Sequence, residues 1–523
     1  MTDLKSTMSS YEFITSGAPR QPDESVWKYR MRKLFTIKSM ESIDEDQKAS
    51  ELKKSLNVFD LIMIGIGGII GNGIFVLAGQ AAATKSGPAV IISILLAGLT
   101  ASFAALSYAE LASMIPISGS SYTYVYATLG ELVAWIIGWD LTLEYLVGAA
   151  AVSVGWSGYF KFFFYHAFSI EFSSSWTDAP FKFNSTTNAF EMTPGSYFNV
   201  PAFCIVIFLT ILLVLGIKES ARFAAFAVSV KLVVIFLFIF VAGAHINTEN
   251  FQPFIPPNQG SFSSFGATGV LAGSTVVFFA YIGFDSISTI AQESRNPQRD
   301  LPISTLGSFS IVSVIYVTVC VVLTGVVSYV KLDNPAPISV AVNAVGLRWL
   351  GIIVDIGAVI GLTSVILVLL MGQPRIFFAM ANDGLFPKFA SKVHPRFGTP
   401  YVITIIGGVI ASMGAAFLPI DVLSELMSVG TLLAFFLVNI GVTILRYTAP
   451  DAPRRFKVPG GPFLLPLIGA ALNILLIATS SVATIVRLFV WMAIGLIVYV
   501  FYGAKRSKVN NKEKYIEEAT TNK

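Results

Sequence analysis

Charged side chains are scarce in this sequence. Lys, Arg, Asp and Glu make up 13% of its 523 residues, whereas soluble globular domains carry about 25%. There are only two cysteines, Cys204 and Cys320, which fall in separate apolar stretches, and three histidines near the ends of such stretches. Neither a disulfide framework nor a metal site is therefore expected, and we expect buried thiols and solvated or interfacial histidines. The histidines are His166, His245 and His394.

Other chemistry-bearing patterns are also missing. The net charge of +4 is spread over tails and loops, and no basic tract suits nucleic acid. The sequence has no nucleophile–base pair or metal-ligand set that would indicate an enzyme. It has no ring-forming filter motif that would indicate a channel.

Long apolar runs dominate what is present. Hydrophobic residues make up 54% of the chain, in runs of about twenty residues, the length that crosses about 30 Å of hydrocarbon. The fold class is therefore an all-α polytopic membrane protein with about 12 transmembrane helices. We expect the spans near 57–84, 88–114, 130–163, 199–217, 224–246, 264–290, 302–328, 340–370, 402–418, 422–446, 463–484 and 486–504.

Loop charge predicts the orientation. With both tails in the cytoplasm, the inside loops hold most of the Lys and Arg, whereas the opposite loop 247–263 holds none. This distribution follows the positive-inside rule. The largest outside loop carries an Asn-Ser-Thr sequence at Asn184, a glycosylation candidate. We expect a cytoplasmic N-terminal tail over 1–56, partly disordered, and a cytoplasmic C-terminal tail over 505–523.

Five glycines crowd the first span, in "IGIGGIIGNGIF" from Ile64 to Phe75. In a helix interior each glycine costs about 0.8–1.0 kcal/mol relative to alanine. One explanation is close helix packing between small residues. The other is that the helix breaks in the middle of the membrane.

A second candidate break, around Gly283 and Asp285 of the sixth span, favours the latter explanation. The two breaks occupy equivalent places in successive groups of five spans, which predicts an inverted five-plus-five repeat. Interrupted spans at matching positions mark the binding site of secondary transporters. Freed N–H groups near Asn72 and Gly73 suit a carboxylate, and freed carbonyls suit an ammonium group, so the breaks suit an α-amino acid. The expected units are 57–246, 264–446 and two extra helices over 463–504, together a domain over 57–504.

Four stretches carry a family resemblance. They are "GIIGNGIFVLAG", "SYAELASMIPISGSSYTYVYATLGELVAWIIGWDLTLEYLVG", "FFAYIGFDSISTIAQESRNPQRDLPI" and "GQPRIFFAMANDGLFPKFASKVHPRFGTP". They resemble the amino acid–polyamine–organocation superfamily, in its cationic amino acid transporter branch. The resemblance implies a leucine-transporter-type fold with discontinuous helices 1 and 6, and amino acid uptake by alternating access.

The resemblance also implies a binding site. The first break would hold the substrate's carboxylate and part of its amine, although many relatives have Ser or Thr where Asn72 stands. Its residues are Ile69, Ile70, Gly71, Asn72 and Gly73. The sixth span would supply amine-binding carbonyls, an apolar wall and a Phe gate, with Asp285 contacting substrate or tying the span to its neighbours. Its other residues are Phe278, Phe279, Ala280 and Ile282.

Charged residues within the spans need a reason, because each costs at least about 2.5–3.5 kcal/mol to insert. Lys231 either snorkels toward the headgroups or, as the resemblance implies, replaces a sodium ion between spans 1, 5 and 8 and carries the coupling proton. Glu144 would serve a cationic side chain or the proton route. Asp140 is a further acidic candidate, Glu110 is expected to be a structural tie, and Asp355 is expected at a span entrance.

The sequence thus predicts a proton-coupled transporter of cationic or neutral L-amino acids, or both. The proton is the coupling ion and no other cofactor or metal is expected. Its partners are the lipid bilayer and a small-molecule amino acid, with no nucleic acid, and the sequence sets no oligomeric state. The alternatives are an exchanger without proton coupling and a non-transporting amino acid sensor. We expect the plasma membrane, with a vacuolar or other internal membrane as the alternative.

Overall fold

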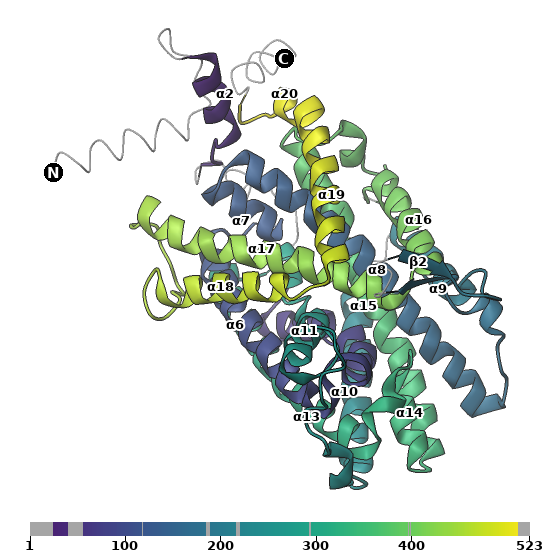
Figure 1. Ribbon diagram of the computed structural model, residues 1–523. Coiled ribbons are helices and arrows are strands. Elements are labelled where there is room, and N and C mark those ends of the chain that lie inside the picture. Colours follow the sequence, from purple (N-terminus) through teal and green to yellow (C-terminus); the bar gives the residue numbers. More distant parts are fainter. Residues whose placement is uncertain are drawn as a thin grey trace.

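The computed structural model describes residues 25–39, 56–117, 119–184, 189–215, 220–291, 294–395, 397 and 399–510. Long α-helices make up most of this part of the chain (Figure 1). The helices up to the sixth predicted span are α2 (Val26–Leu34), α4 (Val58–Ile69), α5 (Ala78–Ala81), α6 (Val90–Met114), α7 (Ser120–Thr128), α8 (Glu131–Phe168), α9 (Val200–Leu215), α10 (Ser220–Leu237), α11 (Gly266–Phe278) and α12 (Ser286–Thr289). The later ones are α13 (Pro297–Val326), α14 (Pro337–Ala344), α15 (Arg348–Asn382), α16 (Tyr401–Phe417), α17 (Ile420–Thr448), α18 (Leu464–Ala478), α19 (Val482–Val498) and α20 (Ala504–Arg506).

Short helical turns and one hairpin connect these helices. The π-helical segments are η1 (Gly73–Leu77), η2 (Ala82–Ser86), η5 (Phe238–Ala242) and η11 (Tyr499–Gly503). The 3₁₀ turns are η3 (Gly87–Ala89), η4 (Ser174–Trp176), η6 (Thr248–Phe251), η7 (Phe279–Tyr281), η9 (Tyr329–Leu332) and η10 (Lys388–Ser391). The strands β1 (Phe181–Asn184) and β2 (Ala189–Met192) pair antiparallel, with Phe181 opposite Met192.

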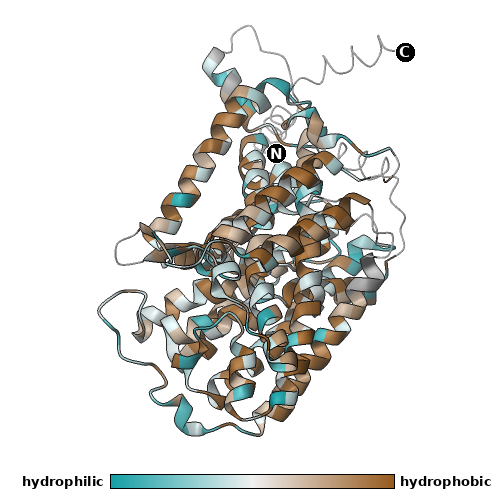
Figure 2. Cartoon of the chain, turned by 90° about the vertical axis from the view of Figure 1, so that its right-hand side faces the viewer, coloured by the Kyte–Doolittle hydropathy of each residue, from teal (hydrophilic) through white to brown (hydrophobic). Residues whose placement is uncertain are grey.

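The apolar helices match the predicted membrane protein. Among the described residues, eight helical stretches are long and apolar enough to cross a membrane: Val58–Met114, Glu131–Phe168, Ala225–Ala242, Gly266–Thr289, Pro297–Val326, Arg348–Asn382, Ile420–Thr448 and Val482–Arg506. Three shorter apolar helices are Val200–Leu215, Tyr401–Phe417 and Leu464–Ala478. Hydrophobic residues dominate these helices in Figure 2. A mostly helical membrane protein is confirmed, whereas the count of twelve and the inverted repeat stay predictions.

Three features of the helices differ from the sequence-based expectation. The span expected near 340–370 is instead two helices: α14 ends at Ala344, Gly346 takes a φ of +76°, and α15 then runs from Arg348 to Asn382. The span was expected to end near 370, but α15 continues through Pro374 to Asn382. Extensive packing of α15 along α8 accounts for its persistence. The stretch 115–129, expected to be a loop, contains α7.

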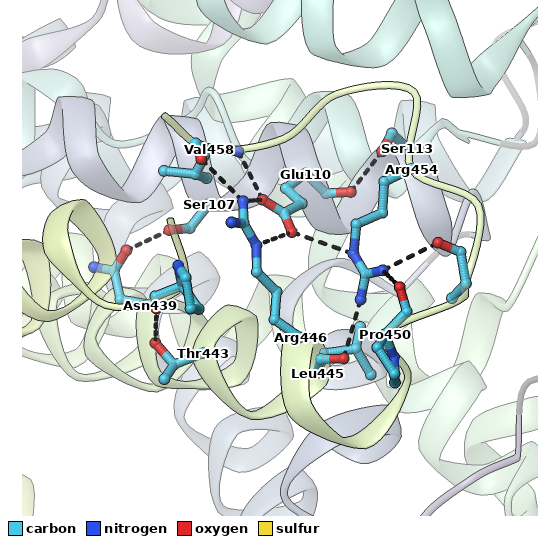
Figure 3. A network of polar contacts seen from close by, with 12 residues as sticks. Ser107, Glu110, Ser113, Asn439, Thr443, Leu445, Arg446, Pro450, Arg454 and Val458 are labelled. Carbon is cyan, nitrogen blue, oxygen red and sulfur yellow. Dashed lines mark hydrogen bonds and ion pairs between the residues drawn. The ribbon is translucent and has the colours of Figure 1, made fainter. Parts of the chain in front are cut away.

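One polar network fastens α6 to α17 and the segment after it (Figure 3). The Glu110 carboxylate is buried and accepts two hydrogen bonds from Arg446, at 2.9 and 2.6 Å. It also accepts one from the Val458 backbone N–H at 2.7 Å, and Arg454 lies 3.4 Å away. The bidentate pairing of a carboxylate with a guanidinium is strong and directional. This confirms the predicted structural tie.

A second network joins the two tail segments at the end of the molecule where Figure 1 shows both α2 and α20. The buried Glu131 carboxylate accepts hydrogen bonds from Tyr126 of α7, Tyr499 of η11, and Ser507 and Asn510 beyond α20. Asn510 also bonds the Lys33 carbonyl of α2 at 3.0 Å. The residues between 25 and 39 are therefore ordered against the helices, although the predicted N-terminal tail includes them.

The predicted glycosylation candidate lies at the end of a strand. Asn184 is the last residue of β1, and Ser185 and Thr186 of its sequence lie outside the described residues. Arg487 of α19 lies over the Phe183 ring at 4.5 Å from its centroid, so the hairpin rests on α19. Use of Asn184 as an acceptor stays a prediction.

Candidate functional site

The first apolar stretch breaks where its glycines predicted. The helix α4 ends at Ile69, because Ile70 takes an extended conformation with φ −71° and ψ 94°. Helical geometry resumes at Asn72, and η1 begins at Gly73. Gly73 is required by a close approach: an added Cβ would lie 2.1 Å from the Cα of Ala280. The glycines therefore permit both the break and a tight contact with the other interrupted segment.

The sixth predicted span breaks opposite the first. The turn η7 ends at Tyr281, Ile282 is extended with ψ 139°, and Gly283 takes a φ of +120°. That φ favours glycine. A Cβ on Gly283 would lie 2.6 Å from the carbonyl oxygen of Gly68, so the backbones of the two breaks touch.

A tyrosine hydroxyl of α13 bridges the two interrupted segments. The Tyr316 hydroxyl lies 2.7 Å from the Ile69 carbonyl oxygen and 2.9 Å from the Ala280 carbonyl oxygen. A phenol has one proton to donate, so it serves these two acceptors in turn or shares the proton between them. Both acceptors are carbonyls that end a helical segment at a break.

A small cavity of about 20 Å³ lies between the breaks. This volume holds about one water molecule, so an amino acid enters only if the surrounding helices move. Its walls come from α4, α8, α15, α17 and the two breaks. They consist of Gly68, Ile69, Gly71, Asn72, Glu144, Tyr145, Val152, Phe279, Ile282, Gly283, Asp285, Ser286, Val365, Val368, Leu369 and Met427.

Most of the predicted site residues meet at this cavity. Seven line it: Ile69, Gly71, Asn72, Phe279, Ile282, Asp285 and Glu144. The other members of the predicted binding set lie beside it: Gly73 and Ala280 contact each other, Ile70 bonds Lys231, and Phe278 packs against the Phe435 ring. The prediction missed the apolar walls from α15 and α17, among them Val365, Leu369 and Met427. These positions carry no local sequence signal.

Two carboxyl groups differ in their surroundings within the cavity. The Tyr145 hydroxyl donates to Asp285 at 3.3 Å. Glu144 is 3% exposed, and its Oε2 has no hydrogen-bond partner among the described residues. Asn72 points toward α8, because its Nδ2 donates to the Ala151 carbonyl at 2.8 Å. The cavity therefore presents one acid with an unused hydrogen-bonding position.

Lys231 of α10 reaches the broken end of α4. Its side chain is fully buried, and Nζ donates to the carbonyl oxygens of Gly67 at 2.6 Å and Ile70 at 2.8 Å. A Cβ on Gly361 of α15 would lie 3.1 Å from the Lys231 Cβ. The ammonium therefore lies among the first, fifth and eighth predicted spans and binds carbonyls that the break leaves free, rather than pointing out to solvent.

Two expectations outside this site are wrong, those for His166 and Cys204. Asp355 lies within the first turns of α15, where it is fully buried and bonds Nδ1 of His166 at 2.6 Å and the hydroxyl of Ser339. Its place at a span entrance stays a prediction. His166 is accordingly buried at 3% exposure rather than solvated. Cys204 is exposed on α9, whereas Cys320 is buried as expected. In a membrane helix, an apolar sequence does not tell a lipid-facing position from a core position.

The fold and site together define a polytopic helical membrane protein in which two helix breaks meet at a small cavity also lined by α8, α15 and α17. The chain matches the amino acid permease family over residues 56–504 and belongs to that family. The predicted relationship to the amino acid–polyamine–organocation superfamily is thereby confirmed.

Three relatives show the range of this similarity. The branched-chain amino acid permease BcaP of Bacillus subtilis (strain 168) is 45% identical over 460 residues, 88% of this chain and 95% of the relative. The methylthioribose transporter of the same organism is 40% identical over 480 residues, 92% of this chain and 100% of the relative. The vacuolar cationic amino acid transporter 4 of Arabidopsis thaliana is 38% identical over 425 residues, 80% of this chain and 68% of the relative.

Proposed function

We propose that this permease is a proton-coupled secondary transporter of neutral aliphatic L-amino acids that works by alternating access. The observation that carries the proposal is the pair of touching helix breaks around one cavity, with a buried lysine bonded to the first break. The proposed architecture is the twelve-helix, inverted five-plus-five arrangement, with units 57–246, 264–446 and 463–504. Both tails are proposed to lie in the cytoplasm, and the proposed location is the plasma membrane.

The breaks supply the chemistry that a zwitterion needs. The first N–H groups of a helix have no intrahelical partner and carry partial positive charge. In our proposal, those of the segment starting at Asn72 bind the substrate carboxylate. Carbonyls at the ends of η7 and α4 bind the ammonium group. The 20 Å³ cavity must widen to admit the substrate, and separation of the two half-helices at the Gly68–Gly283 contact would widen it.

The cavity walls favour an aliphatic side chain. Val152, Ile282, Val365, Leu369 and Met427 line it, and they bury apolar surface well. The name of BcaP as a branched-chain permease agrees with this choice. A second candidate is a cationic substrate, because the free Glu144 Oε2 would accept a hydrogen bond from an ammonium or guanidinium group. The cationic transporter relative supports that candidate.

Proton coupling is proposed to act through Lys231, with Glu144 on the proton route. A protonated Lys231 holds two carbonyls at the end of α4 and so stabilises this arrangement of the first break. Loss of the proton weakens both hydrogen bonds because it removes their charge assistance. Protonation is thereby linked to the position of α4, which is what a proton-driven alternating mechanism requires.

Uptake by the purified protein in proteoliposomes tests the proposal. We expect an inward proton gradient to drive accumulation of labelled leucine above its equilibrium level. Competition by the twenty amino acids then separates the two substrate candidates: isoleucine and valine should compete, whereas arginine and lysine should not. Competition by arginine alone would instead assign the cationic class.

The same preparation separates the alternatives to a proton symporter. Counterflow without gradient-driven accumulation would show an exchanger, and binding without flux would show a sensor. Either result would reject proton-coupled transport.

A further inference from the structure

Asp140 of α8 is a buried acid that the proposed binding site does not use. Its side chain is fully buried, and neither carboxyl oxygen has a hydrogen-bond partner among the described residues. It does not line the cavity. Gly430 of α17 packs against it, because a Cβ added there would lie 2.9 Å from Oδ1 of Asp140. Glycine at this position leaves room for the carboxyl group.

A carboxyl group in such surroundings is neutral. A buried charge is expensive unless an opposite charge and hydrogen bonds compensate for it. Asp140 has neither in the described part of the chain, so in this conformation it holds its proton. An acid that is protonated when buried releases that proton once water reaches it.

The acid one helical turn away is Glu144. Residues four apart lie on the same face of a helix, about 5–6 Å apart at Cβ, a gap that one water bridges. Glu144 lines the cavity, and its Oε2 is also unpartnered. Asp285 faces it across the cavity, with Tyr145 as its hydrogen-bond donor. Asp140 and Glu144, one helical turn apart on α8, therefore both have a carboxyl oxygen without a hydrogen-bond partner among the described residues.

Several charged groups on the helices packed against α8 have partners other than Asp140. On α17, Glu425 accepts from Ser481 and Thr484, and Arg446 binds Glu110. On α15, Asp355 bonds His166 and Asp383 bonds Lys38. On α19, Arg487 lies over Phe183, and on α7 the Tyr122 hydroxyl donates to Asp383. None of these contacts involves Asp140, so Glu144 is its titratable neighbour on this helix face.

We propose that Asp140 is a second proton-binding site that receives the coupling proton from Glu144 and releases it at the Glu131 end of α8. Asp140 first releases its own proton to solvent, and its carboxylate then takes up the proton of Glu144 through one water. The O–H bond of Glu144 breaks as that of Asp140 forms, and no other bond changes. Asp140 lies between Glu144 and Glu131 along α8, and the predicted orientation places the Glu131 end in the cytoplasm. This inference rests on the proposed proton coupling.

The test compares two kinds of transport in proteoliposomes. Asp140→Asn keeps the shape of the neutral acid but has no proton to release. We expect accumulation of labelled leucine under an inward proton gradient to fall at least tenfold, because net transport needs proton release. Leucine counterflow at equal pH on both sides should stay within twofold of the parent, because exchange needs no net proton movement. The control, Asp333→Asn, makes the same change at an exposed position and should behave as the parent.

Each result decides between the inferences. If Asp140→Asn accumulates leucine as the parent does, Asp140 is not a proton site. If counterflow falls as far as accumulation, Asp140 has a structural role and the relay is rejected. If the parent shows no gradient-driven accumulation, the proposed coupling fails and the relay falls with it. Should the Asn variant be misfolded, as judged by a polydisperse gel-filtration profile, Asp140→Ser removes the same proton with a smaller side chain and meets the same criteria.

Discussion

Replacement of Lys231 by methionine tests the link between the buried lysine and the first break. Methionine fills a similar volume but donates no hydrogen bond, so the carbonyls of Gly67 and Ile70 lose their donor at 2.6 and 2.8 Å. A buried acceptor left unsatisfied costs about 1–3 kcal/mol. Two such acceptors destabilise this arrangement by about 2–6 kcal/mol, and the lower figure corresponds to about 30-fold in population. The variant should therefore favour conformations in which water reaches the end of α4.

The expected transport result follows from that shift. Lys231→Met should lose proton-driven leucine accumulation in proteoliposomes while retaining counterflow at a reduced rate. A lysine exposed on β1 supplies the matched control, and Lys182→Met should accumulate leucine as the parent does. If Lys231→Met concentrates leucine with the pH dependence of the parent, the lysine has no part in coupling.

Three further substitutions test the packing around the site. Gly283→Ala combines a φ of +120° with a Cβ 2.6 Å from the Gly68 carbonyl oxygen, so it should disturb the breaks that bind the substrate. Added leucine should therefore no longer raise the melting temperature of this variant. Gly260→Ala, with a φ of +89° and nothing within 4 Å, should keep this rise in melting temperature; equal behaviour of the two would contradict the close approach. Glu110→Ala leaves a partly buried arginine without its carboxylate and should lower the free energy of unfolding by about 3 kcal/mol. The unfolding midpoint should fall accordingly, and an unchanged midpoint would show that the Glu110–Arg446 pair is dispensable. Glu131→Gln replaces an acceptor of four side-chain hydrogen bonds, so proteolysis should release the C-terminal segment faster than in the parent.

The helix breaks could be predicted because their cause is local. Glycine clusters weaken a helix wherever they occur, and the breaks fall at Ile70 and at Ile282–Asp285, within the predicted segments. The buried position of Lys231 is one of two interpretations of the sequence, the one that the family resemblance implies, and snorkelling toward the headgroups is the other. Its bonds to the Gly67 and Ile70 carbonyls could not be predicted, because they depend on how α10 packs on α4.

Other features escaped prediction because they depend on contacts between distant segments. His166 and Asp355 are 189 positions apart, and neither sequence environment indicates that they pair. The cavity wall from α15 depends on the packing of that helix against α8, whereas its own sequence shows no single apolar face that would mark the wall. The helix α15 also continues through Pro374, beyond the expected end near 370, because its packing along α8 outweighs the loss of one backbone hydrogen bond.

The contacts at the end of α4 also limit what a proton alone can do. A neutral Lys231 amine still has two N–H groups for its two carbonyl acceptors, but each bond falls from the charge-assisted range of about 1.5–3 kcal/mol to about 0.5–1.5 kcal/mol. Loss of the proton would therefore weaken the end of α4 by about 2–3 kcal/mol in total. A complete switch between two conformations needs about 5.5 kcal/mol. The rest of this free energy must come from substrate contacts in the breaks. Tyr316 also holds the end of α4, through the Ile69 carbonyl. We therefore expect proton and amino acid to move this helix end only in combination.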